Sequence, residues 1–177
     1  MRKCLIAVFL GLGILAHAQQ PQQPKPAATL KTVLLQELRE THNEKAWFVS
    51  EKEAVAGLTP EQAAWSDGKN HSVGQLVQHL NYWNSANLAR LKHQPAPNVA
   101  NNDVTFAFDP TQWDVALKEF DRVMGELEQF VQSADDTTLA KIAPTMARIA
   151  QHNAYHIGEM VTSRKKQGTW NPETGVK

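Results

Sequence analysis

The chain has 177 residues, of which 42% are hydrophobic, and it carries 18 basic and 18 acidic residues and one cysteine. This charge balance lacks the excess of positive charge that marks nucleic-acid-binding proteins or proteins held on anionic membranes. The one cysteine, Cys4, excludes a disulfide within the chain.

The first 18 residues have the pattern of a secretory signal. Arg2 and Lys3 precede the apolar stretch "CLIAVFLGLGIL", and the small-residue ending "AHA" predicts cleavage after Ala18. Lipid anchoring would require a cysteine at the end of the apolar stretch, whereas Cys4 lies at its beginning. We therefore expect an exported protein, periplasmic or secreted, that is free of the membrane after cleavage. The mature chain would lack cysteine and carry 16 basic against 18 acidic residues, a formal charge of −2.

The segment 19–28, "QQPQQPKPAA", is rich in Gln and Pro and poor in apolar residues. This composition is typical of a solvated linker rather than of a packed element. One domain is expected over 29–170, because that length suits a single hydrophobic core, followed by a short tail at 171–177.

Two helices are predicted in the first half of the domain. Apolar residues at helical spacing predict a helix over 29–56, which "GLTPEQ" ends with a Gly and a Pro. A second helix is predicted over 72–93, with His71 or Ser72 in the N-cap region and an apolar stripe that includes Leu76, Leu80 and Trp83.

The segment 95–110, "PAPNVANNDVTFAFDP", is long for a connection between neighbouring antiparallel helices. It is long enough to return the chain along the bundle before a third helix, which a strongly amphipathic pattern predicts over 111–132. A fourth helix is predicted from Pro144, in its first turn, to Gln167, with Gly168 as its stop signal. No strand-like alternation of any length occurs, so the predicted fold is an all-α four-helix bundle.

Histidines on two of these helices are candidate metal ligands. His152 and His156 are four residues apart and therefore project from the same side of the fourth helix. Catalytic zinc sites typically use three protein ligands, and His79, beside the apolar stripe of the second helix, is the best third candidate. His42 is a weaker candidate near the inward edge of the first helix. His71 and His93, at helix ends, are given no role.

The alternative is that these histidines are ordinary core residues. A single inward His is usually hydrogen-bonded in the core, and a pair at this spacing also arises by chance. Three buried neutral imidazoles are nevertheless hard to satisfy without a cation or water, which favours a metal. Asn153 stands where the HExxH zinc-protease motif has its Glu, so a protease is rejected.

Glu159 follows His156 by three residues and lies on the same helical face. It is a candidate catalytic group, either as a general base toward water or as a partner that orients an imidazole, and it is also a candidate fourth ligand. The simpler interpretation is a surface carboxylate near the end of the bundle. The sequence leaves these interpretations open.

Three stretches together follow the pattern of one known family. "LTPEQAAWSDGKNHSVGQLVQHLNYWN" is similar to its linker and second helix, "IAQHNAYHIGEM" to its fourth-helix histidine pair, and "RKKQGTW" to its closing segment. The chain thereby resembles the DinB-like superfamily over nearly the whole of 29–170. The resemblance implies an up-down-down-up bundle with a long crossover between helices two and three. It also implies a divalent metal, commonly zinc or nickel, on His79, His152 and His156, whereas Glu159 stands where the family usually has Gln.

The resemblance implies an activity less sharply than a site. We expect an exported metal-dependent hydrolase of an unidentified small molecule. One alternative is a thiol-dependent transferase or isomerase, which export disfavours because such thiols are mainly cytoplasmic, and another is a non-catalytic metal- or ligand-binding protein. Trp83, Tyr155 and the segment 95–110 are candidates for the pocket, and related bundles often form homodimers.

Overall fold

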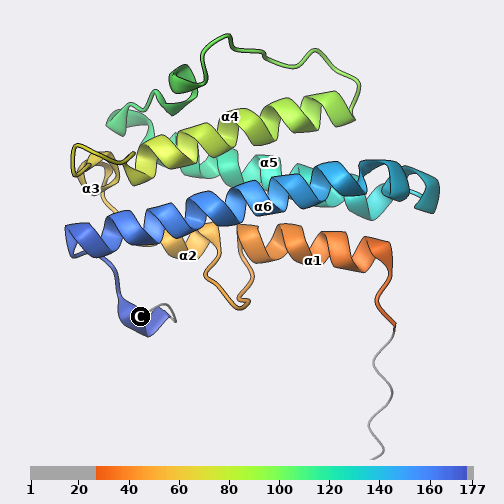
Figure 1. Cartoon of the computed structure of the whole chain (residues 1–177), viewed down its shortest axis with the longest axis horizontal. Coiled ribbons are helices and arrows are strands. Elements are labelled where there is room, and N and C mark those ends of the chain that lie inside the picture. The colour runs from red at the N-terminus through yellow and green to blue at the C-terminus, as the bar shows by residue number, and fades with distance from the viewer. Residues whose placement is uncertain (1–26, 175–177) are drawn as a thin grey trace, which may run out of the picture.

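A computed structural model describes residues 27–174, so the predicted signal at 1–18 and most of the predicted linker lie outside the described residues (Figure 1). The described residues form α-helices and short 3-10 helices, with no strand among them. These elements are α1 (Leu30–His42), α2 (Glu51–Val55), α3 (Pro60–Ala64), α4 (Val73–Leu91), η1 (Asn102–Phe106), η2 (Pro110–Gln112), α5 (Trp113–Ser133), α6 (Asp136–Gln167) and η3 (Pro172–Thr174).

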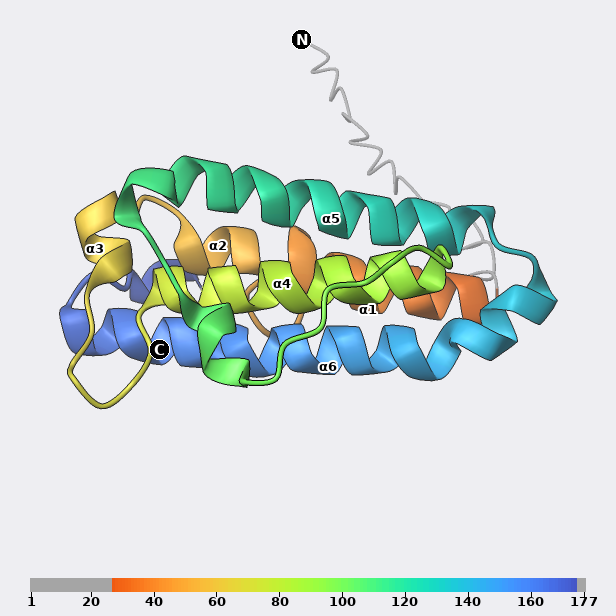
Figure 2. The ribbon, with the colours of Figure 1, turned by 90° about the horizontal axis from the view of Figure 1, so that it is seen from above.

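Four long segments form the bundle. The pair α1 and α2, taken together, and α6 run in one direction along it, and α4 and α5 run in the other (Figures 1 and 2). The segment 92–112 crosses over α4 on its way back to the start of α5 (Figure 2). The order is therefore up-down-down-up with a long crossover, and the predicted all-α bundle is confirmed.

Side-chain caps explain where most of the helices begin. A hydroxyl or carboxylate at the N-cap accepts a hydrogen bond from a backbone N–H of the first turn, which would otherwise lack a partner. These caps are Thr29 for α1, Ser50 for α2, Thr59 for α3, Ser72 for α4 and Asp135 for α6. At the other end of α6, Gly168 adopts φ of 79°, a left-handed conformation that favours glycine.

The core follows the predicted apolar face of α5. Its buried residues recur every three or four positions, which places them on one side of the helix, toward α1 and α4. They are Trp113, Ala116, Phe120, Val123, Met124, Leu127 and Val131.

The predicted continuous helix over 29–56 is wrong, because the chain leaves the helix after His42 and resumes it at Glu51. The N–H groups of Asn43 and Glu44 both bond to the carbonyl of Arg39, which closes the end of α1. The intervening loop still places Val49 in the core, at 7% exposure. Both helices bury apolar residues, but the loop that ends in the Ser50 cap separates them. The buried apolar residues are Leu34, Leu35 and Leu38 in α1 and Ala54 and Val55 in α2.

The predicted start of the fourth helix at Pro144 is also wrong, because α6 begins eight residues earlier, at Asp136. The Asp135 carboxylate caps that end, and Leu139 and Ile142 in the added turns are buried. Proline in a helix interior removes a backbone hydrogen bond and bends the helix. Burial of these two side chains compensates for that loss, and α6 bends near its N-terminal end (Figure 2).

The closing segment "RKKQGTW" joins the end of α6 to the rest of the bundle. Arg164 is buried, and its guanidinium donates to the carbonyl oxygens of Ala54 at 2.8 Å and Thr169 at 2.9 Å. It also lies over the ring of Trp170, 5.3 Å from its centroid. No helix within residues 27–174 combines the length and apolar character needed to cross a membrane.

Candidate metal centre

Three histidines from α4 and α6 converge at one point. His79 Nε2 lies 3.2 Å from His152 Nε2, which in turn lies 3.0 Å from His156 Nε2. His79 and His156 are buried at 3% and 7% exposure, and His152 is half-buried. The predicted pair on α6 thus meets the third histidine that was predicted on α4, since these two helices pack together.

Hydrogen bonds at the outer ring nitrogens fix two of the three tautomers. The Thr105 hydroxyl donates to the carbonyl of Asn102 at 2.6 Å, so its oxygen accepts from His79 Nδ1–H, also at 2.6 Å. The carboxylate of Glu159 accepts from His156 Nδ1–H at 2.6 Å. Both rings therefore direct an Nε2 lone pair toward the cluster, as metal-bound imidazoles do.

Phe106 of η1 forms one wall of this site. Its ring stacks on His79 at 4.0 Å between centroids and on His71 at 3.8 Å, so it lies between the two imidazoles. The crossover that carries Phe106 and Thr105 thus closes the cluster from outside α4. His71, for which no role was predicted, is part of this wall because the crossover brings Phe106 against it.

The site keeps two of its imidazoles neutral at ordinary pH. Burial, followed by the neighbouring His156, His152 and His71, lowers the pKa of His79 to about 3. Burial, followed by His156, lowers the pKa of His152 to about 4, although Glu159 acts in the opposite direction. The neutral ring is the form in which histidine binds a metal.

This donor set fits a divalent metal. Nitrogens that each lie about 2.1 Å from one zinc ion are about 3.0 to 3.4 Å apart, and the Nε2 separations of His152 from its two neighbours, 3.0 and 3.2 Å, fall in that range. The Nε2 lone pairs of His79 and His156 both point at His152. Without a cation, only a proton on His152 Nε2 could form a hydrogen bond with them, and one proton would have to be shared by two acceptors. Nitrogen ligands of this kind suit zinc, nickel, copper and iron, so the donors alone do not select the metal.

The model of one protein family, described as the DinB superfamily, matches residues 52–160. The chain belongs to the DinB superfamily. The match spans α4, the crossover, α5 and the part of α6 with the histidine pair, and DinB-like proteins bind metals. No curated protein and no solved structure matches the chain.

Two polar residues close to the DinB-like histidine pair face in different directions. Asn153, where a zinc protease would have its Glu, is fully buried and its Oδ1 accepts from Asn84 Nδ2 at 3.1 Å in the core. Glu159, the predicted catalytic candidate, is partly exposed and touches His156. The catalytic role of Glu159 stays a prediction, and its observed contact is that of a positioning residue.

His42, the weaker candidate, lies in a separate cluster. It is buried, and its two ring nitrogens lie 2.7 Å from Glu128 and 3.0 Å from Asp121, both on α5. Burial alone would lower the pKa of His42, but hydrogen bonds and charges from Glu128 and Asp121 outweigh it and raise the pKa above 6.5. His42 therefore joins α1 to α5 and takes no part in the DinB-like metal centre.

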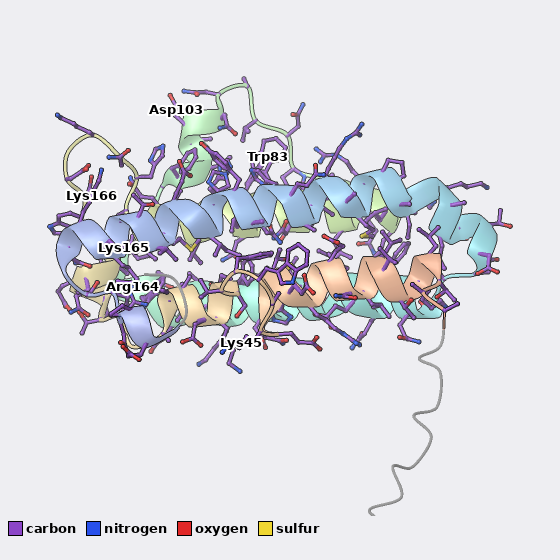
Figure 3. All side chains as sticks on the ribbon, turned by 60° about the horizontal axis from the view of Figure 1, so that its bottom comes forward. Lys45, Trp83, Asp103, Arg164, Lys165 and Lys166 are labelled. Atoms are coloured by element: carbon purple, nitrogen blue, oxygen red, sulfur yellow. The ribbon has the colours of Figure 1, made fainter. Side chains whose placement is uncertain are left out.

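Two clefts border the metal centre. Their linings include Trp83 and Tyr155, the two aromatic residues that were predicted to contribute to the pocket. One, of about 380 Å³, is lined by His79, His152, Trp83 and residues of α6 and η1. The other, of about 390 Å³, is lined by Glu159, Tyr155 and His71. Trp83 and Asp103 lie on the side of the bundle that the crossover covers, opposite Lys45 of the loop between α1 and α2 (Figure 3).

Proposed function

We propose that this DinB-superfamily protein is an exported metal-dependent hydrolase that acts on a small molecule. The observation that supports this most directly is the convergence of His79, His152 and His156 through Nε2, with the outer nitrogens of two of them held by hydrogen bonds. A divalent ion there, zinc or nickel, would polarise a carbonyl or phosphoryl oxygen and make water more acidic.

The chain's own residues would prepare the site for this chemistry. Thr105 and Glu159 hold the rings of His79 and His156 in one tautomer, so these ligands need no rearrangement. Phe106 covers one face of His79 and excludes water from it, whereas His152 borders an open cleft through which a substrate could enter. Glu159 would accept a proton from water or, through His156, strengthen the ligand set.

Hydrolysis is preferred over thiol transfer because it requires only metal, water and substrate. The predicted signal at 1–18 would carry the protein away from the cytoplasm, where low-molecular-weight thiols are concentrated. Both reactions use the same metal centre. The two reactions are therefore distinguished by the substrate that the protein consumes and not by the residues that bind the metal.

The first experiment is elemental analysis of the chain from Gln19, purified without chelator or a His tag. We expect one divalent ion per chain, lost in each of the variants His79→Ala, His152→Ala and His156→Ala. His93→Asn is the matched control, because His93 lies in an exposed left-handed turn (φ 55°) and asparagine tolerates that conformation. Stoichiometric metal in any of the three alanine variants, at wild-type affinity, would contradict the site.

The second experiment separates the activities. The metal-loaded chain is assayed with carboxylic esters, amides and phosphate esters, and with electrophiles in the presence of low-molecular-weight thiols. We expect metal-dependent release of an acid product that the His79→Ala variant does not catalyse. Consumption of thiol instead would indicate a transferase, and bound metal without turnover would leave a metal- or ligand-binding protein.

A further inference from the structure

Arg148 differs from every other arginine in residues 27–174 because it has no hydrogen-bond or ion-pair partner there. The remaining four are held by acceptors within the bundle. Arg39 bonds to Glu128, Arg90 to Asn87 and Pro97, Arg122 to Glu119 and Glu126, and Arg164 to Ala54 and Thr169. A guanidinium has five donors in a planar fork, so Arg148 retains its full capacity to bind an oxyanion.

Arg148 lines the cleft that borders the histidine cluster. It precedes His152 by four residues on α6, which places both side chains on the same face of the helix. His79 and His152 belong to the lining of this cleft, of about 380 Å³. A small molecule bound there can therefore touch Arg148 and lie beside the metal centre.

The other polar groups of the cleft are also suited to an anion. Asn87 Oδ1 accepts from Arg90 at 3.3 Å and Asn102 Oδ1 accepts from Trp83 at 3.1 Å, so each amide has its Nδ2 group left as a donor. Thr145 adds a hydroxyl, and no Asp or Glu lines this cleft. The second cleft, by contrast, contains Glu159, and its one lysine, Lys166, is already paired with Asp67 at 2.8 Å. Negative charge is therefore favoured beside His152 and not beside Glu159.

We propose that this cleft is an oxyanion subsite, in which Arg148 anchors the carboxylate or phosphate of the small molecule on which the metal centre acts. The inference rests on the proposed function and narrows its substrate class to anionic molecules. The guanidinium fork matches two oxygens of either group. The anchored end fixes the orientation, and the remainder of the molecule extends toward His79 and His152.

Trp83 provides a local probe of this subsite, because it lines the cleft and its indole N–H donates to Asn102. The chain is labelled with ¹⁵N, and its indole N–H signals are followed by two-dimensional NMR, with Trp83→Phe used for assignment. Acetate and inorganic phosphate are titrated separately into metal-free and zinc-loaded protein at constant pH and ionic strength. Neutral acetamide serves as the ligand control.

We expect a saturable shift of the Trp83 signal with at least one of the two anions, already in the metal-free protein, and none with acetamide. Arg148→Gln should weaken anion binding at least about tenfold. Arg148→Lys keeps the charge but loses the fork, so its affinity for the anion should lie between those of the wild type and Arg148→Gln. Lys141→Gln removes one positive charge from the same helix outside the cleft and should leave the affinity unchanged. A stronger response to phosphate than to acetate would select phosphate-bearing substrates, and the reverse would select carboxylates.

No saturable shift, or a shift that Arg148→Gln leaves unaltered, would overturn the proposal. The metal content of Arg148→Gln, which should equal that of the wild type, separates this outcome from failure of the metal centre. Anion binding without stoichiometric metal would retain the subsite and refute the hydrolase. Stoichiometric metal without anion binding would refute the oxyanion subsite and leave the metal centre in place.

Discussion

Glu159 Oε2 lies 2.6 Å from Nδ1 of His156, one helical turn earlier on α6. The contact fixes the proton of His156 on the nitrogen that faces away from the cluster. The partly exposed carboxylate thus acts on the centre through an imidazole and not by direct contact with the other two rings. This geometry makes the contribution of Glu159 testable.

Removal of that acceptor should weaken metal binding. Loss of a carboxylate that orients a ligand histidine typically costs about ten- to a hundredfold in metal affinity, and we expect this for Glu159→Ala. Glu159→Gln should lose less, because its amide oxygen can still accept from Nδ1. Competition with a chelator of known affinity measures the metal affinity of both variants. Thr162→Ala is the control, because Thr162 lines the same cleft as Glu159. Equal affinities for wild type and Glu159→Ala would show that His156 is oriented without the carboxylate.

Thr105 should matter for the same reason on the other side of the cluster. Thr105→Val keeps the shape of the side chain but leaves the Nδ1–H of buried His79 without an acceptor, at a cost of about 1 to 3 kcal/mol. We expect a lower unfolding midpoint in urea and weaker metal binding. Thr105→Ser retains the hydroxyl and should therefore keep most of the stability and most of the metal affinity of the wild type. Failure of the serine variant to recover metal affinity would assign the loss to packing instead.

Gly74 allows the crossover to lie close to α4. A Cβ at this position would overlap the ring of Phe108, whereas a Cβ at Gly125 would meet only open space. Gly74→Ala should therefore destabilise the protein by about 1 to 3 kcal/mol through overpacking, and Gly125→Ala should stabilise it by about 0.5 to 1 kcal/mol through helix propensity. Urea denaturation measures both. Since Phe108 follows Thr105 and Phe106 closely, we also expect weaker metal binding in Gly74→Ala alone.

Glu51 should make the protein less stable as the pH rises. Burial, followed by the charge of Asp121, raises its pKa from 4.5 to about 8, and its Oε1 has no hydrogen-bond partner among residues 27–174. Between these two values the folded chain holds a proton that the unfolded chain releases, so the free energy of unfolding falls as the pH rises.

Glu51→Gln should remove this dependence, because a neutral amide does not titrate. We expect the variant to be more stable than the wild type by about 1 to 4 kcal/mol at about pH 9 and close to it at about pH 5. Urea unfolding across this pH range tests the difference. Glu37→Gln, at an exposed position on α1, should leave the pH profile unchanged. Parallel profiles for the wild type and Glu51→Gln would refute the buried titration.

Local signals placed most of the helices correctly. The three- and four-residue spacing of apolar residues defined α5, and Ser72 and Gly168 marked the start of α4 and the end of α6. Such signals failed where a tertiary contact outweighed them. Pro144 looked like a helix start, but burial of Leu139 and Ile142 extends α6 before it. The apolar residues of 29–56 are buried from two helices and the loop between them, and not from one continuous helix.

Helical periodicity was enough to predict which imidazoles could share a ligand, because it places His152 and His156 on one face of a helix and His79 beside an apolar stripe. The residues that surround these imidazoles, by contrast, follow from the way the chain packs. The contacts of Thr105 with His79, of Phe106 with His71, and the shared cleft of Arg148 and Asn102 all depend on the path of the crossover. That path is set by long-range packing against α4, for which a sequence carries no periodic signal, so these residues become visible only in the folded chain.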